Sequence, residues 1–124
     1  MLTKEQRDNF DIDPVIKFCY DYILPITDDR VLATHGAEIS LITKSGDMVC
    51  TYDSIQVPTY NDPDNCEFNP DYNCDESGRA YVDDFLLIIQ DGMYGLIDYD
   101  GNIVIDPKYS VLRFVSQDKM ELFE

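Results

Sequence analysis

Gly92–Tyr109 reads GMYGLIDYDGNIVIDPKY, which predicts two apolar strands joined by a glycine turn. The earlier stretch Ile39–Tyr52, ISLITKSGDMVCTY, has the same order of strand, glycine turn and strand. The two stretches align residue for residue from Ile39 opposite Tyr94 up to a Pro-Lys pair that the earlier one lacks. Self-similarity of this kind is typical of proteins built from repeated supersecondary units.

A tyrosine-led motif marks the opening of a strand around these stretches. It occurs as Tyr20-Asp21-Tyr22-Ile23, Tyr52-Asp53-Ser54-Ile55 and Tyr109-Ser110-Val111-Leu112. With 124 residues, the chain has the length of one domain, which buries roughly two thirds of the surface of its unfolded form. We therefore predict a single domain, 1–124, with repeat-like units at about 20–58 and 81–123.

Runs of Val, Ile, Leu and Tyr bounded by turn formers predict that strands dominate the chain. Short turns at Ser45-Gly46, Asp91-Gly92 and Asp100-Gly101 make consecutive strands antiparallel neighbours, because a parallel crossover needs about a dozen residues. The predicted fold is mostly β, an antiparallel meander of repeated β-hairpin units that forms a curved sheet or a barrel-like body. The predicted strands are 20–24, 30–35, 38–43, 47–52, 54–58, 80–90, 93–98, 102–106, 109–114 and 118–123.

The N-terminal part is less regular. Thr3-Lys4-Glu5-Gln6 is a possible capping box, which predicts a short helix that runs to about Phe10. The segment 15–20 has two interpretations: a second short helix with Asp13 as its cap and Pro14 at its first position, or a degenerate strand of the first repeat. Its place directly before a tyrosine-led motif favours the strand.

Residues 59–80 interrupt the repeat with an acidic insertion rich in turn formers. Loops of this length inside a compact domain are usually functional or disordered. Cys66 and Cys74 would form a bridge across the insertion in an oxidising compartment and stay free thiols in the cytoplasm. Cys19 and Cys50, at apolar strand positions, are predicted to be small buried hydrophobic residues.

The stretch YGLIDYDGNIVIDPKY, residues 94–109, resembles the WG-repeat (KWG) family, whose units run approximately aromatic-Gly-Leu-Ile-Asp-x-x-Gly-x-x-Val-Ile-x-Pro-x-Tyr. The resemblance is good over 86–113 and fair over 31–58. Tyr94-Gly95 stands where the family has Trp-Gly, and the chain contains no Trp, so it resembles a divergent member. The resemblance implies short antiparallel β-units in one curved sheet or barrel-like body, no catalytic apparatus, and an interaction or scaffold role.

The chain carries 25 acidic and 9 basic residues, a net charge of −16. This charge repels phosphate backbones, so we expect no direct nucleic-acid binding, and a basic protein is the natural partner. Acidity that serves solubility alone is the competing interpretation. No apolar run approaches the roughly 18 residues of a membrane helix. The N-terminus lacks the apolar stretch of a secretory signal. We therefore expect no membrane association and a cytoplasmic location.

Residue types that carry chemistry are sparse. His35 is the only histidine, and a lone histidine at a strand end favours neither a metal site nor general-base catalysis. The cysteines form no C-x-x-C pair, which argues against zinc-ribbon and thioredoxin-like sites. The acidic insertion offers oxygen ligands, but their spacing does not fit an EF-hand loop. We predict no enzyme activity, no cofactor and no metal.

The function predicted from charge is that of a non-catalytic inhibitor of the anti-CRISPR or anti-restriction type, phage or bacterial. Such a nucleic-acid mimic occupies a basic nucleic-acid-binding surface of its target, for example a nucleic-acid-processing enzyme. Turn carboxylates at Asp28, Asp29, Asp98 and Asp100 would extend this surface. The alternatives are a general WG-repeat scaffold and a small-ligand-binding β module with tyrosine walls. The predicted partner-binding residues are Asp62, Asp64, Glu67, Asp71, Tyr72, Asp75, Glu76, Asp83 and Asp84.

Overall fold

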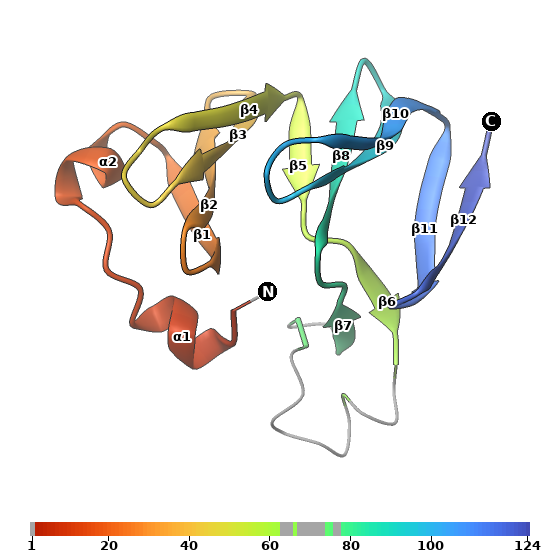
Figure 1. Ribbon diagram of the computed structural model, residues 1–124, viewed down its shortest axis with the longest axis horizontal. Coiled ribbons are helices and arrows are strands. Elements are labelled where there is room, and N and C mark those ends of the chain that lie inside the picture. Colours follow the sequence, from red (N-terminus) through yellow and green to blue (C-terminus); the bar gives the residue numbers. More distant parts are fainter. Residues whose placement is uncertain (1, 63–65, 67–73, 76–77) are drawn as a thin grey trace.

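The computed structural model describes residues 2–62, 66, 74–75 and 78–124, and shows short strands arranged side by side along the long axis of the molecule (Figure 1). Two short helices precede the strands: α1 (Lys4–Asp8) and α2 (Pro14–Phe18). The strands are β1 (Tyr22–Thr27), β2 (Arg30–His35), β3 (Glu38–Thr43), β4 (Met48–Tyr52), β5 (Ser54–Gln56), β6 (Thr59–Asn61), β7 (Arg79–Tyr81), β8 (Phe85–Gln90), β9 (Met93–Asp98), β10 (Ile103–Tyr109), β11 (Val111–Ser116) and β12 (Lys119–Phe123).

The strands form two four-stranded sheets, β1-β2-β3-β4 and β10-β9-β8-β5, and two ribbons, β11-β12 and β6-β7. All the pairings are antiparallel. The prediction of a mostly β, antiparallel fold is confirmed. Curved sheets are present, and no closed barrel forms among the described residues.

The two four-stranded sheets repeat the same order of strands. The strands β2, β3 and β4 begin at residues 30, 38 and 48, and β8, β9 and β10 begin at 85, 93 and 103, which is 55 residues later in each case. The strand before each trio, β1 or β5, begins within one of the tyrosine-led motifs and pairs with β2 or β8. We call β1–β4 unit 1, and β5 with β8–β10 unit 2. The ribbon β11-β12, which begins within the third motif, is unit 3.

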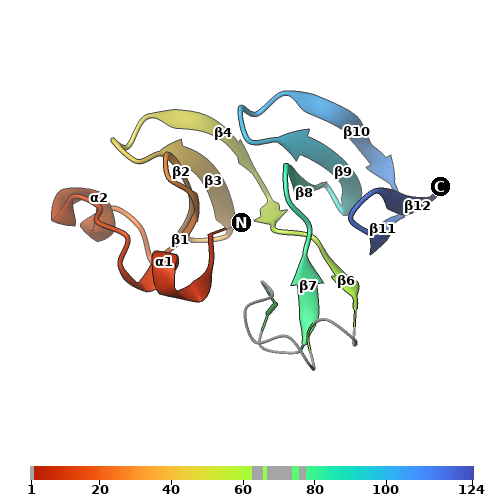
Figure 2. The same ribbon diagram turned by 60° about the horizontal axis from the view of Figure 1, so that its bottom comes forward.

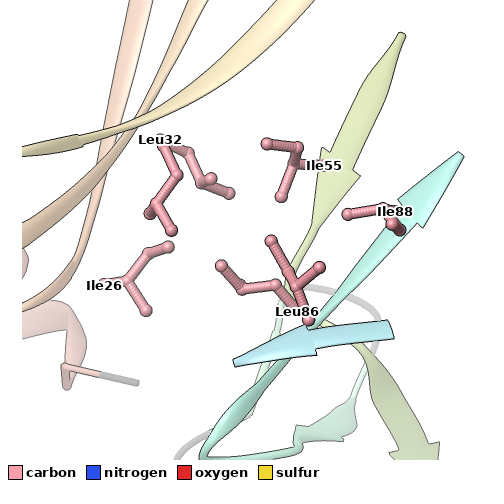
Figure 3. Packing of buried hydrophobic residues seen from close by; sticks show 7 residues of the cluster. Ile26, Leu32, Ile55, Leu86 and Ile88 are labelled. Atoms are coloured by element: carbon pink, nitrogen blue, oxygen red, sulfur yellow. The ribbon is translucent and has the colours of Figure 1, made fainter. Parts of the chain in front are cut away.

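The two sheets pack face to face through apolar side chains (Figure 3). Leu32 and Leu41 of unit 1 meet Leu86, Ile88 and Ile97 of unit 2, and all five are buried. The outer face of unit 1 packs against the helical segment, and the outer face of unit 2 packs against unit 3 and the β6-β7 ribbon. The result is a short stack in which the helices, unit 1, unit 2 and unit 3 follow one another (Figures 1 and 2).

The N-terminal helix has the predicted capping box. The Thr3 hydroxyl accepts a hydrogen bond from the Gln6 N–H, and the Gln6 side chain accepts one from the Thr3 N–H. The strand favoured for 15–20 is wrong, because Pro14–Phe18 forms α2. The Asp13 carboxylate accepts a hydrogen bond from the Val15 N–H at 2.9 Å, so the cap and proline at the start of this segment determine its local structure.

The strand predicted over 80–90 is divided into β7 and β8. Asp84 has a φ of 74°, a left-handed conformation that interrupts a strand and that Asp tolerates better than most residues. The insertion also contains more regular structure than predicted, because β6 and β7 pair at its base. There the Arg79 Nε donates a hydrogen bond to the Thr59 hydroxyl at 3.0 Å.

The four cysteines differ in environment. Cys66 and Cys74 form a disulfide bond within the insertion. Cys50 packs against the core between the two sheets, and burial raises the pKa of its thiol. The prediction that Cys19 is buried is wrong: it is the C-cap residue of α2 and is exposed, because α2 turns that end of the segment toward solvent. No helix among the described residues has the length and apolar character needed to cross a membrane.

Candidate functional site

The predicted partner-binding residues fall into three groups. Asp62 and Asp75 lie at the base of the insertion, and Asp83 and Asp84 lie directly before β8. The remaining five lie outside the described residues: Asp64, Glu67, Asp71, Tyr72 and Glu76.

The carboxylates at the base of the insertion are half-buried. The Asp75 carboxylate accepts a hydrogen bond from the Arg79 N–H at 2.8 Å. The Asp62 carbonyl accepts one from the N–H of Cys66, the residue bridged to Cys74. These hydrogen bonds fix both acidic residues at the base of the insertion.

Asp83 and Asp84 are exposed and connect three turns. The Asp84 N–H donates to the Tyr99 hydroxyl in the β9–β10 turn at 3.0 Å. The Asp83 N–H donates to the side-chain oxygen of Gln117 in the β11–β12 turn at 2.9 Å, and the Gln117 amide donates back to the Asp83 carbonyl at 3.1 Å. The backbone amides make these bonds, so both carboxylates project from a fixed turn.

Arg30 joins unit 1 to the same turn of unit 2. Its Nε donates to the Tyr99 carbonyl at 2.7 Å, its Nη1 to the Asp29 carboxylate at 2.6 Å and its Nη2 to the Asp100 carboxylate at 3.0 Å. One largely buried guanidinium therefore holds two exposed carboxylates from different units side by side. Lys44, in the β3–β4 turn, also donates its N–H to the Asp29 carbonyl at 3.2 Å.

The acidic positions recur with the repeat. Asp29, Asp84 and Asp118 each directly precede the second strand of a unit, β2, β8 or β12. Because alternate turns of a meander lie at the same end of a sheet, these residues and the β9–β10 turn lie at one end of the stack. We call this surface the acidic rim, formed by Asp28, Asp29, Asp83, Asp84, Asp98, Asp100 and Asp118.

Tyr99, beside the rim, and Asp98, within it, have shifted pKa values. The pKa of Tyr99 is raised to about 12, first by burial and then by the negative charges of Asp83 and Asp84, against a hydrogen bond from the Asp84 N–H that lowers it. Burial raises the pKa of Asp98, but hydrogen bonds from the turn, mainly from Asn102, outweigh it and leave this pKa below its usual value. The carboxylate of Asp98 therefore stabilises the turn in its charged form.

Sequence reasoning identified six of the seven rim residues and missed Asp118. A signal for Asp118 was present in the sequence. This residue precedes the second strand after the third tyrosine-led motif, as Asp84 precedes β8, the second strand of unit 2. Reading the third motif as the start of a unit would have found it.

Other residue types that can carry chemistry lie apart from the rim. Among the described residues, no group of three or more His, Cys, Asp or Glu side chains is placed to hold a metal ion. His35 is exposed at the end of β2, where its ring lies edge-on to Tyr20. An open hollow beside the helices is lined in part by Tyr20, Tyr22 and Phe10, whereas the space between the two sheets is filled by core residues.

Comparison with known families bears on the C-terminal half of the stack. Residues 94–119 match the WG containing repeat. This stretch runs from β9 through β10 and β11 to the first residue of β12, so the region similar to the family crosses the boundary between units 2 and 3. Curated proteins and solved structures give no match. The family match supports a repeat module of the kind that mediates protein interactions.

Proposed function

We propose that this chain is a non-catalytic protein-binding module whose acidic rim occupies the basic nucleic-acid-binding surface of a partner protein. The observation that carries the proposal is the recurrence of Asp29, Asp84 and Asp118 at the same place in three stacked units. A repeated carboxylate of this kind presents negative charge at regular intervals, as a nucleic-acid backbone does.

The rim is also suited to binding because two of its carboxylates, and the backbone that carries two more, are held in place before a partner arrives. Arg30 fixes Asp29 and Asp100, and the Tyr99 hydroxyl fixes the turn that carries Asp83 and Asp84. Carboxylates that are already ordered lose less side-chain freedom on binding. A fixed array favours a partner with a matching field of Lys and Arg.

The test is affinity capture from nuclease-treated lysate with two matched variants of the chain. The rim variant replaces Asp28, Asp83, Asp84 and Asp118 by Asn, and it leaves in place the three rim carboxylates whose hydrogen bonds hold the turns. The control variant makes the same change in charge away from the rim. It combines Glu38→Gln, Asp91→Asn, Asp106→Asn and Glu124→Gln.

Both variants carry a net charge of −12, four units less negative than the −16 of the natural chain. We expect the natural chain and the control to capture a nucleic-acid-binding protein that added duplex DNA or RNA displaces. The rim variant should capture it at least roughly tenfold more weakly, because each exposed ion pair contributes up to about 1 kcal/mol. Equal loss in both variants would contradict a specific role of the rim.

A general interaction module is the second candidate, and the match of residues 94–119 to the WG containing repeat favours it. In that case the bound protein should be indifferent to added nucleic acid and to salt, since charge would serve solubility. The same capture experiment distinguishes the two functions.

A further inference from the structure

Unit 3 repeats the first two strands of the other units. The pair β11-β12 places Leu112 opposite Leu122, just as β5-β8 places Ile55 opposite Ile88. In units 1 and 2 the second strand has a further neighbour on its other side, β3 beside β2 and β9 beside β8. Within the described part of the chain, β12 pairs with β11 alone.

The side chains that the extra neighbours would cover are exposed in unit 3. Leu122 is 38% exposed, whereas the corresponding Ile88 is completely buried. Val49 of β4 lies under the β9–β10 turn, where a Cβ added to Gly101 would come within 2.8 Å of it. The residue of β10 that corresponds to Val49 is Val104, and it is 48% exposed. Two apolar side chains, Leu122 and Val104, are therefore exposed at the positions that a third hairpin would cover.

This end of the molecule differs in charge from the rest. Residues 107–124 contain as many basic as acidic side chains, so the net charge of −16 comes entirely from residues 1–106. A neutral surface with exposed apolar side chains and a free strand edge favours an apolar β segment over the basic partner of the rim. The charged residues counted within 107–124 are Lys108, Arg113, Asp118, Lys119, Glu121 and Glu124.

We propose that the edge of β12 that β11 leaves unpaired, together with Leu122 and Val104, binds a β-hairpin of the same repeat type as β9-β10. The bound hairpin continues the sheet of unit 3 by strand addition. Units 1 and 2 define its chemistry. The strand against β12 carries a central Leu-Ile pair, as at Leu41-Ile42 and Leu96-Ile97, and a turn glycine lies over Val104 as Gly101 lies over Val49.

The probe is a synthetic peptide with the sequence 91–109 of this chain, which contains β9 and β10. It is added to the full chain, and protection of backbone amides from hydrogen exchange is read residue by residue. We expect added protection at Lys119–Phe123 that is lost in Leu122→Lys and Val104→Lys. Val15→Lys, which adds a charge at an exposed apolar residue of α2, is the matched control and should leave the protection unchanged.

A second peptide carries Gly101→Val and should protect β12 at least tenfold less well, because the turn would collide with Val104. Three results would overturn the proposal. The first is no added protection at β12, and the second is protection confined to β8, where the peptide would have replaced the chain's own β9. Sedimentation of the chain alone as a dimer, with no response to the peptide, would assign the surface to a second copy.

Discussion

Units 1 and 2 have the same order of strands, and a buried position of their third strands shows an instructive difference. Ser40 of β3 and Gly95 of β9 correspond to each other. The Ser40 hydroxyl lies 2.8 Å from the Thr51 hydroxyl on the neighbouring strand, so unit 1 fills this position with a side chain and a hydrogen bond. In unit 2 a Cβ on Gly95 would lie 2.6 Å from the Ile105 carbonyl oxygen and 2.8 Å from the Pro107 nitrogen.

The difference between Ser40 and Gly95 arises from the Pro-Lys pair that only unit 2 has. Pairing between β9 and β10 shifts register between Ile105 and Tyr109, so the extra residues form an irregularity that brings the backbone of β10 onto Gly95. Unit 1 has no such pair, and Ser40 pairs directly with Thr51. The glycine of the repeat is therefore required by the irregular strand beside it, and a unit without that irregularity accepts serine.

Exchanging the two residues tests this comparison with the largest expected effect. Gly95→Ser should destabilise the fold by about 4 kcal/mol, because the nearest atoms belong to the backbone and cannot move aside. Ser40→Gly should cost about 1 kcal/mol, through the lost hydrogen bond and the added freedom of a strand glycine. Urea unfolding measures both, and equal losses would contradict the explanation.

The glycines of the β3–β4 and β9–β10 turns give the second contrast. Gly101 has a φ of +84° and Gly46 one of +95°, so valine is strained at either. A Cβ on Gly101 would lie 2.8 Å from Val49 of unit 1, whereas one on Gly46 would lie 3.2 Å from the end of the Ile16 side chain. We expect losses of about 3 kcal/mol for Gly101→Val and about 2 kcal/mol for Gly46→Val.

The contacts at Gly46 and Gly101 also indicate what α2 does. Ile16 of α2 contacts the turn of unit 1 as Val49 contacts the turn of unit 2, so the helix takes the position of a preceding unit. Thermal unfolding of the two variants is the measurement. A larger loss at Gly46 than at Gly101 would show that α2 packs more rigidly than β4.

The smallest expected effect concerns Tyr99, which stands where unit 1 has Lys44. Its pKa of about 12 lies above the ordinary value of about 10. Folding thus favours the protonated phenol. The stability that this group contributes is complete below about pH 10 and declines as pH rises toward 12.

Tyr99→Phe should cost about 1 kcal/mol at pH 8, because the Asp84 N–H loses its acceptor. The variant should also lose less stability than the natural chain between pH 9 and pH 11. Urea midpoints at several pH values provide the measurement. Parallel losses in the two proteins would contradict the raised pKa.

Much of the fold could be predicted because the determining interactions are local. The glycine turns and alternating apolar runs place β2, β3 and β9 at the residues predicted for them. The division of 80–90 escaped prediction, because the left-handed backbone of Asp84 interrupts the strand. The hydrogen bonds at this turn, from Asp84 to Tyr99 and from Asp83 to Gln117, are made with residues farther along the chain.

The candidate site was predictable only in part. The acidic pairs before β2 and β8 were visible in the sequence as carboxylates at turns. The pairing of Asp29 with Asp100 through Arg30 was not visible, because these two residues are 71 positions apart and meet only when the two sheets stack. The cytoplasmic location stays a prediction. The disulfide bond between Cys66 and Cys74 is a feature typical of oxidising compartments instead.

The most direct test of the central claim is competition for the captured partner. Labelled duplex DNA or RNA bound to that partner is titrated with the natural chain, the rim variant and the control variant, and fluorescence anisotropy reports release. We predict stoichiometric release by the natural chain and the control, weakened by added salt, and release by the rim variant only at roughly tenfold higher concentration. A ternary complex in which the nucleic acid stays bound would contradict the claim that the rim occupies its site.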